Sequence, residues 1–163
     1  MEQYALYPGS FDPITFGHLN ILERALDIFA QVTVLVAVNP QKKTLFSTAE
    51  CVEMVEEATH AWDRVKIDHH AGLLVDYART QDIRIAVRGL RAVTDFESEF
   101  AMALMNRKLW PQFDTVFLMT GAGYMYLSSS MVRQIAQMGG DVGCFVPPCV
   151  ERRLKEKFTR FQK

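Results

Sequence analysis

Apolar runs alternate with segments of helical pattern along the whole chain. Five short runs, rich in β-branched and aromatic residues, predict strands at 4–7, 32–38, 65–67, 83–87 and 115–119. The run from Val32 to Val38 shows no polar alternation, which is typical of a strand that is buried on both faces. Because a helical segment separates each strand from the next, we expect an α/β fold. It should be a single Rossmann-like domain, with a five-stranded parallel sheet and helices on both faces.

The ends of the predicted helices carry capping signals. Ser47 and Glu50 have the spacing of a capping box, and so do Thr94 and Glu97. The pair Gly139-Gly140 is well suited to a left-handed cap at a helix end. These signals and the apolar periodicity predict helices at about 17–29, 47–60, 73–81, 94–109 and 128–139, and a last one after 147–148.

Length and charge narrow the class of protein. The chain has 163 residues, so we expect one domain, 1–163, and its net charge of −1 offers no basic surplus for nucleic acid or an anionic membrane. The longest apolar run is too short to span a bilayer, and the polar start Met1-Glu2-Gln3 is unlike a signal peptide. We therefore expect a cytoplasmic protein. Cys51, Cys144 and Cys149 form no CxxC pair, which favours free thiols and argues against a protein-bound metal.

The segment between the first strand and the first helix carries the most specific chemistry. Ser10-Phe11-Asp12-Pro13 is followed by Thr15-Phe16-Gly17-His18, so a tight loop leads into a helix that opens with a histidine. Unpaired backbone N–H groups and the helix dipole make such a start a cradle for phosphate, and the imidazole adds a donor. The segment lacks the Gly-Lys-Ser/Thr of a Walker A loop. Taken alone, however, a Gly-His pair is more often an ordinary helix start.

Other polar residues also follow predicted strand ends. In an open parallel sheet these ends meet at one edge, where ligands bind at the switch point of strand order. Each group has a plain structural alternative: a solvated loop for the lysines, ion pairs of Arg88 and Arg91 with Asp95 and Glu99, and a helix cap for the serines. Jointly the groups indicate a site for a small polyanion such as nucleotide phosphate. They are Lys42 and Lys43 after the second strand, Arg88, Gly89, Leu90 and Arg91 after the fourth, and Ser128, Ser129 and Ser130 after the fifth.

Together these motifs resemble those of the phosphopantetheine adenylyltransferases, a bacterial family within the nucleotidyltransferase superfamily. The resemblance covers nearly the whole chain. The segment from Tyr7 to His18 marks the wider superfamily, whereas Arg88-Gly89-Leu90-Arg91 followed by Asp95-Phe96-Glu97 is more specific to the family. The implied reaction transfers the adenylyl group of ATP to 4′-phosphopantetheine, giving dephospho-CoA and pyrophosphate by direct in-line attack, without a covalent intermediate.

The resemblance also assigns residues to roles. Catalysis is expected to depend on His18, Ser10 and Lys42, with His18 stabilising the transition state at the α-phosphate. The acceptor is expected to contact Ser10, Lys42, Leu74 and Arg88. ATP is expected to contact Ser10, Phe11, His18, Gly89, Leu90, Arg91, Glu99, Tyr124, Met125, Tyr126, Leu127, Ser128, Ser129 and Ser130. Mg²⁺ is expected on the ATP phosphates with few or no protein ligands, in line with its usual binding to nucleotides.

Two departures and two alternatives remain open. Ser10 stands where the family commonly has threonine, and the segment 120–126 is richer in glycine than is usual in the family, which leaves its contacts with adenine undecided. A sister transferase acting on nicotinamide mononucleotide or glycerol phosphate would share the nucleotide half of the site. A module that senses nucleotide or CoA without turnover is the other alternative. The family further implies a homohexamer and CoA as a candidate inhibitor.

Overall fold

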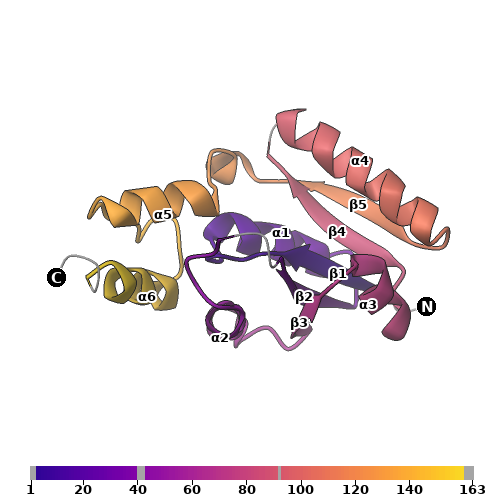
Figure 1. Ribbon diagram of the computed structural model, residues 1–163, viewed down its shortest axis with the longest axis horizontal. Helices are drawn as coiled ribbons and strands as arrows, with labels where there is room; N and C mark the ends of the chain where they lie inside the picture. Colours follow the sequence, from indigo (N-terminus) through magenta and orange to yellow (C-terminus); the bar gives the residue numbers. More distant parts are fainter. Residues whose placement is uncertain (1–2, 40–42, 92, 160–163) are drawn as a thin grey trace.

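A single parallel sheet forms the centre of the molecule. The computed structural model describes residues 3–39, 43–91 and 93–159. The strands are β1 (Tyr4–Gly9), β2 (Gln31–Val38), β3 (Val65–Ala71), β4 (Ile85–Leu90) and β5 (Asp114–Met119). They pair in parallel in the order β3-β2-β1-β4-β5 (Figure 1). The predicted five-stranded parallel sheet is therefore confirmed.

Helices connect and follow the strands. They are α1 (Phe16–Leu26), α2 (Thr48–Thr59), α3 (Leu74–Thr80), α4 (Val93–Leu109), the 3-10 turn η1 (Ala122–Tyr124), α5 (Ser129–Gln137) and α6 (Pro148–Thr159). The capping box of Ser47 and Glu50 is confirmed at the start of α2, and Gly139 takes a left-handed φ of 79° after α5. The second predicted capping box is wrong: α4 begins at Val93, so Thr94 lies inside its first turn.

Alternate residues of the central strand β1 face opposite layers of helices. Ala5 and Tyr7 pack in the larger core cluster, which takes in the apolar faces of α1 and α2. Leu6 packs on the opposite side with Val75 and Ala78 of α3. This two-residue alternation places helices on both faces, as the sequence predicts. Beyond the strands, α5 and α6 lie side by side and complete the larger cluster (Figure 1).

Three strands run past their predicted ends, and β3 does so by continuing from Ile67 to Ala71. Pro8 and Gly9 belong to β1 and pair with Leu35 and Val36 of β2, although glycine and proline are uncommon in strands. Arg88, Gly89 and Leu90 likewise belong to β4, where they pair with β5 rather than forming a loop after the strand. Pairing with neighbouring strands therefore overrides local propensity. As a result, the side chain of Arg88 projects from the paired end of a strand.

A single glycine sets the distance between α1 and β4. A Cβ atom built on Gly89 would lie 2.8 Å from Cγ1 of Ile21, closer than side chains tolerate. The missing side chain lets α1 pack directly on the sheet, which brings the start of α1 to the end of β4.

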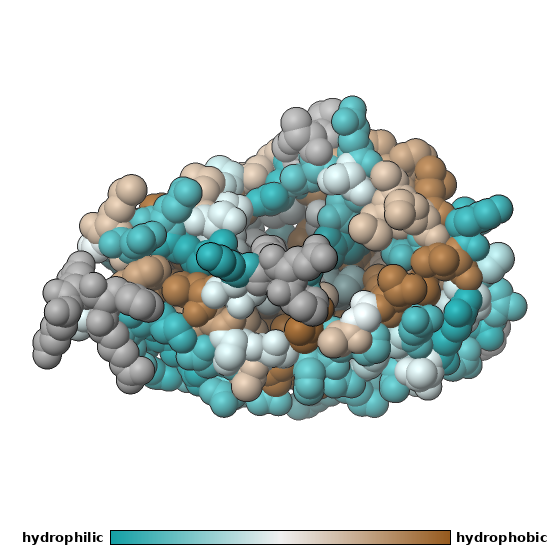
Figure 2. Space-filling model, in the orientation of Figure 1, coloured by the Kyte–Doolittle hydropathy of each residue, from teal (hydrophilic) through white to brown (hydrophobic). Residues whose placement is uncertain are grey.

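The surface of α4 carries exposed apolar side chains. Figure 2 shows this part of the surface at the upper right, above the sheet. Scattered apolar residues are normal on a surface, but a helix that exposes this many indicates a face available for contact. The large exposed apolar residues of α4 are Phe96, Phe100, Met102, Leu104, Met105 and Leu109.

In the part of the chain that the structure describes, no helix is long and apolar enough to cross a membrane.

Candidate nucleotide site

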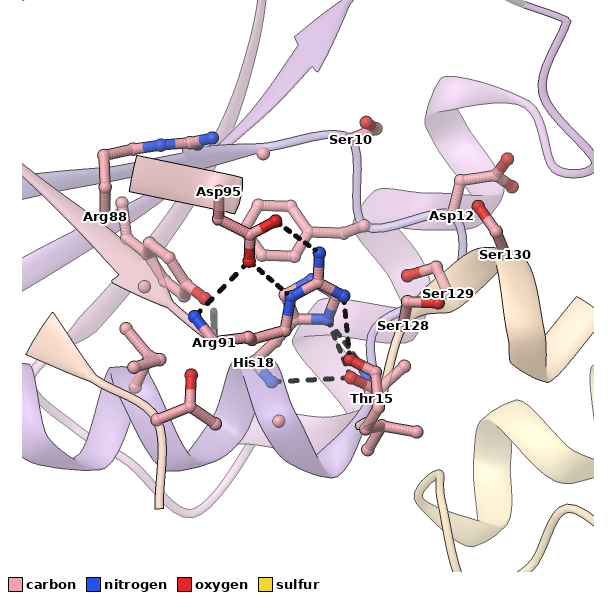
Figure 3. Close-up of a pocket in the computed structure, with 18 of the residues that line it drawn as sticks. Ser10, Asp12, Thr15, His18, Arg88, Arg91, Asp95, Ser128, Ser129 and Ser130 are labelled. Atoms are coloured by element: carbon pink, nitrogen blue, oxygen red, sulfur yellow. Dashed lines mark hydrogen bonds and ion pairs between the residues drawn. The ribbon is translucent and has the colours of Figure 1, made fainter. Parts of the chain in front are cut away.

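A cleft of about 300 Å³ lies at the carboxyl ends of β1 and β4. From β1 the chain proceeds outward through β2 and β3, then returns to pair β4 on the other side of β1. The cleft therefore lies at the switch point of strand order, where open α/β sheets bind their ligands. Figure 3 shows residues from the β1–α1 loop, β4, α4 and the start of α5 gathered around it.

Most of the predicted site residues meet in this cleft. Those that line it are Ser10, Phe11, His18, Arg88, Gly89, Arg91, Glu99, Leu127, Ser128, Ser129 and Ser130. Among the described residues, six predicted ones are not part of its lining: Lys43, Leu74, Leu90, Tyr124, Met125 and Tyr126. Leu74 begins α3 after the edge strand β3, and Tyr124 approaches the start of α1 beside Gly17. Lys42 lies outside the described residues.

His18 is part of the cap of its own helix. Thr15 is the N-cap of α1, and its hydroxyl accepts from the backbone N–H of His18. In return the Thr15 backbone N–H donates to Nδ1 of His18 over 3.1 Å, so that the imidazole takes the place of the glutamate of a capping box. Because Nδ1 accepts this bond, the proton of the neutral ring resides on Nε2. The ring is thereby oriented with a donor nitrogen available to a ligand.

The surroundings of His18 keep its ring neutral. Burial lowers the pKa of His18 from 6.5 to about 4, and the positive charges of Arg91 and Arg88 act in the same direction. The ring of Phe11 packs against it edge-to-face, with the ring centres 5.1 Å apart. Phe11 itself is fully buried and holds a left-handed φ of 45°, which is unusual for a side chain of this size. The substrate-free site thus presents a neutral imidazole near neutral pH.

Two arginines of the cleft form ion pairs with α4. Arg88 donates from Nε and Nη2 to both carboxylate oxygens of Glu99, and from Nη1 to the carbonyl of Pro8. Arg91 donates from Nε and Nη2 to Asp95, over 3.0 and 3.2 Å, and from Nη1 to the carbonyl of Leu127. The ion pairs considered as an alternative from sequence therefore exist, but they line the cleft. Each guanidinium has five N–H donors, and these bonds use three of them.

A third arginine of the cleft went unnoticed in the sequence. Arg133 of α5 donates from Nη1 to the carboxylate of Asp12 over 3.2 Å and also to the Asp12 carbonyl. It lies one helical turn after Ser129 and Ser130, so helical periodicity at a predicted helix start was the signal that could have found it. Other residues of the lining that sequence reasoning did not assign to the site include Thr15 and Ser98.

The charge balance of the cleft corrects the expected surplus of positive charge. Within the described residues of the lining, each of the three arginines has a carboxylate partner, namely Glu99, Asp95 or Asp12. Attraction of an anion thus rests less on net charge than on oriented N–H donors. The serines of α5 add to these, although Ser128 caps the helix by accepting from the Met131 N–H and Ser129 donates to the Pro13 carbonyl.

Comparisons with known proteins agree with this geometry. Residues 6–135 match the family model described as cytidylyltransferase-like. The chain is 53% identical over 154 residues to the phosphopantetheine adenylyltransferase of Heliobacterium modesticaldum. The aligned residues make up 94% of this chain and 92% of that protein. It is 50% identical over 157 residues to the enzyme of that name from Syntrophotalea carbinolica, covering 96% and 95% of the two chains.

A solved structure supports the fold independently of close sequence similarity. A candidate nicotinate-nucleotide adenylyltransferase from Vibrio parahaemolyticus superimposes with a TM-score of 0.70 at 17% identity, covering 98% of this chain and 96% of that one. At this identity the likeness shows a shared nucleotidyltransferase-like Rossmann fold and nothing finer.

Proposed function

This chain belongs to the phosphopantetheine adenylyltransferase family, and from that premise we propose that it transfers the adenylyl group of ATP to 4′-phosphopantetheine by direct in-line attack. Relatives of that name support adenylyl transfer in coenzyme A biosynthesis. The observation that carries the proposed mechanism is the convergence of one neutral histidine, three arginines and a serine-rich helix start on a single cleft at the switch point.

The chemistry requires positioning more than proton transfer. A phosphate oxygen of the acceptor attacks the α-phosphorus of ATP, the new P–O bond forms, and the bond to the β-phosphate oxygen breaks with release of pyrophosphate. Because a phosphate monoester is ionised near neutral pH, the attacking oxygen needs no general base. The site then contributes by aligning the two phosphates and stabilising charge on the oxygens of the transition state.

We assign the central role to His18. Its Nε2–H donates to an oxygen of the α-phosphate, and Thr15 holds the ring in the required tautomer through Nδ1. A neutral donor suits this position, because it stabilises the transferring phosphate without having to lose a proton when the products leave. The polyphosphate of ATP lies along Arg91 and the serines at the start of α5, where oriented N–H and O–H groups meet it.

We assign the acceptor to the side of the cleft nearer β4. Arg88 binds its phosphate with N–H groups that the pair with Glu99 leaves unused, and Ser10 contacts both reacting phosphates. Glu99 then acts on the ligands through Arg88 and not only by direct contact, which refines the role that the family resemblance gives it. Lys42, which lies outside the described residues, and Leu74, which is not part of the described lining, complete the proposed acceptor site.

Further ligands and the assembly belong to the same proposal. Mg²⁺ would enter with the ATP phosphates and neutralise their charge; the carboxylates of the cleft are already engaged by arginines, which does not favour a dedicated protein cage. We propose a cytoplasmic enzyme without nucleic-acid or membrane partners, with dephospho-CoA as product and CoA as a candidate inhibitor. The exposed apolar face of α4 supports the proposed homohexamer.

The decisive experiment measures pyrophosphate release with magnesium, ATP and one acceptor at a time. We expect release with 4′-phosphopantetheine, and none with nicotinamide mononucleotide, glycerol phosphate or no acceptor. His18→Ala should bind ATP but lose roughly 10²–10³-fold in kcat, as expected for one lost transition-state donor. Release only with another acceptor would overturn the substrate assignment, and no release with any acceptor would favour a binding module without turnover.

A further inference from the structure

Asp12 lies at the centre of a cluster that joins two segments of the cleft, the β1–α1 loop and α5, to the segment that precedes α2. It belongs to the loop between β1 and α1, and only 2% of its surface is exposed. Its carboxylate accepts from the backbone N–H groups of Leu45 and Phe46, over 3.0 and 2.9 Å, and from Arg133 of α5. The three donors come from segments that lie more than 30 positions away along the chain.

The hydrogen bonds of Asp12 exclude a direct part in the chemistry. A carboxylate has about four lone-pair positions, and three donors already approach this one in a buried setting. Accepting a proton would put a fourth donor among them, and binding a cation would displace the backbone amides. The side chain is therefore built to hold neighbouring groups rather than to react.

The groups that Asp12 holds are functional or adjoin functional groups. Asp12 lies two residues after Ser10, and its main-chain oxygen accepts a second bond from Arg133. Arg133 follows Ser129 and Ser130 by one turn of α5, and Ser129 donates to the carbonyl of Pro13 over 2.8 Å. The hydrogen bonds donated by Arg133 and Ser129 therefore tie the first turns of α5 to the β1–α1 loop.

The segment before α2 is held from a second direction. The ring of Phe46 is 2% exposed within the larger core cluster, and the ammonium of Lys157 lies 5.1 Å from its centre. The side chain of Phe46 is held in the core and its backbone N–H is bonded to Asp12, so the segment before α2 is held in one orientation relative to the cleft. The Asp12 carboxylate is the group that transmits this orientation to the β1–α1 loop.

We propose that Asp12 is a positioning residue for adenylyl transfer: its buried carboxylate anchors both the β1–α1 loop and the start of α5 to residues 45–46, so that groups of the loop and of α5 meet the same phosphates. The inference rests on the proposed function. A displacement of about 1 Å at a reacting group can cost on the order of 10² in rate. An amide cannot replace the carboxylate, because its NH₂ group would face donors where only acceptors fit.

The test compares Asp12→Asn with Glu53→Gln, which makes the same change of carboxylate to amide in the pair with Arg153 at the surface. Two readouts are needed: kcat at saturating ATP and acceptor, and hydrogen exchange of the Leu45 and Phe46 amides without substrate. Exchange at Val34 and Val36 in β2 reports global unfolding. Should Asp12→Asn fail to fold, Asp12→Glu serves instead, since it keeps the charge and shifts the carboxylate by one methylene.

We expect Asp12→Asn to lower kcat by 10–100-fold and to speed exchange at Leu45 and Phe46 while β2 stays protected, with Glu53→Gln unchanged in both. For Asp12→Glu the same changes should be smaller. The proposal is overturned if a folded Asp12 variant keeps the wild-type kcat. It is also overturned if kcat falls while exchange at the Leu45 and Phe46 amides is unaltered. The exchange readout needs no turnover, so its outcome is separate from the acceptor assay that tests the proposed function.

Discussion

Two sets of ion pairs in the described part of the chain differ in where they lie. One set lines the cleft and pairs Arg88 with Glu99, Arg91 with Asp95 and Arg133 with Asp12. The other joins the outer helices α2 and α6: Arg152 pairs with Glu57, Arg153 with Glu53 and, over 4.0 Å, with Glu57, and Lys157 with Glu50. The side-chain types are nearly the same in both sets. What differs is the surroundings, and these decide what a pair does.

Neighbouring groups make the cleft set specific. Each of its arginines also donates to a main-chain carbonyl, that of Pro8, Leu127 or Asp12, so its planar group has one orientation. Among the outer pairs, Glu57 and Arg152 are 43% and 59% exposed, and water screens their attraction. We conclude that the cleft set orients donors within the cleft, whereas the outer set adds only modestly to stability.

The largest expected effect is on the acceptor. Arg88→Met should raise the KM for 4′-phosphopantetheine by about 10²-fold or more, because it removes the guanidinium that we assign to the acceptor phosphate. Truncating one partner of such a desolvated charge pair costs roughly 2–5 kcal/mol. ATP affinity should change little, as titration calorimetry can verify. Arg153→Met makes the same substitution in the outer set and should leave kcat/KM within about twofold. A loss of ATP affinity instead would mean that the two subsites are reversed.

The second effect concerns stability and pH. The pKa of His18 is about 4 in the folded protein against an ordinary 6.5, so between these values the unfolded chain binds a proton that the folded chain does not. The free energy of unfolding should therefore be unaffected by this group above pH 6.5 and fall as the pH drops below it, by about 2 kcal/mol at pH 5. Urea unfolding of wild type and His18→Asn, measured at pH 7.5 and pH 5, isolates the contribution.

The same unfolding experiment tests whether the surroundings of the cleft keep the His18 ring neutral. If the difference between wild type and His18→Asn were the same at both pH values, the cleft would not be suppressing the charge of the ring. An increase in the relative stability of wild type toward acid pH would contradict the sign of the pKa change.

The third effect is on the pKa of His18, which should respond to an arginine of the cleft set but not to one of the outer set. Arg91→Met should raise the pKa of His18 from about 4 toward its ordinary value, because it removes a positive charge that opposes protonation of the ring. Arg152→Met should leave that pKa unchanged. NMR titration of the His18 ring in substrate-free protein measures both. Equal responses to the two substitutions would show that net charge, and not the local pair, governs the site.

The smallest effect is expected for the outer set itself. Glu53→Gln should lower the melting temperature by about 2 °C or less at low salt, as is usual for an exposed pair. In 1 M salt the difference should disappear, because the screening length falls to about 3 Å. A larger loss that persists in high salt would erase the distinction between the two sets.

Much of the fold and part of the site follow from the sequence. Apolar runs and helical periodicity predict the order of strands and helices, and Ser47 with Glu50 marks the start of α2 because a capping box involves only nearby residues. Tyr7 to His18 predicts the phosphate cradle, since its loop, cap and imidazole lie within one short segment. Most predicted site residues meet in the cleft because the carboxyl ends of parallel strands share one edge.

Strand ends and ion pairs were decided by tertiary structure. Local propensity ends β4 before Arg88, but pairing with β5 carries it to Leu90. The partners Asp12 and Arg133 lie 121 positions apart, and the amides of Leu45 and Phe46 become donors to Asp12 only once the loops are packed together. A sequence shows which residues can carry charge or hydrogen bonds. Which of them meet depends on how distant segments pack, because these interactions fall off within a few ångströms and say nothing about separation along the chain.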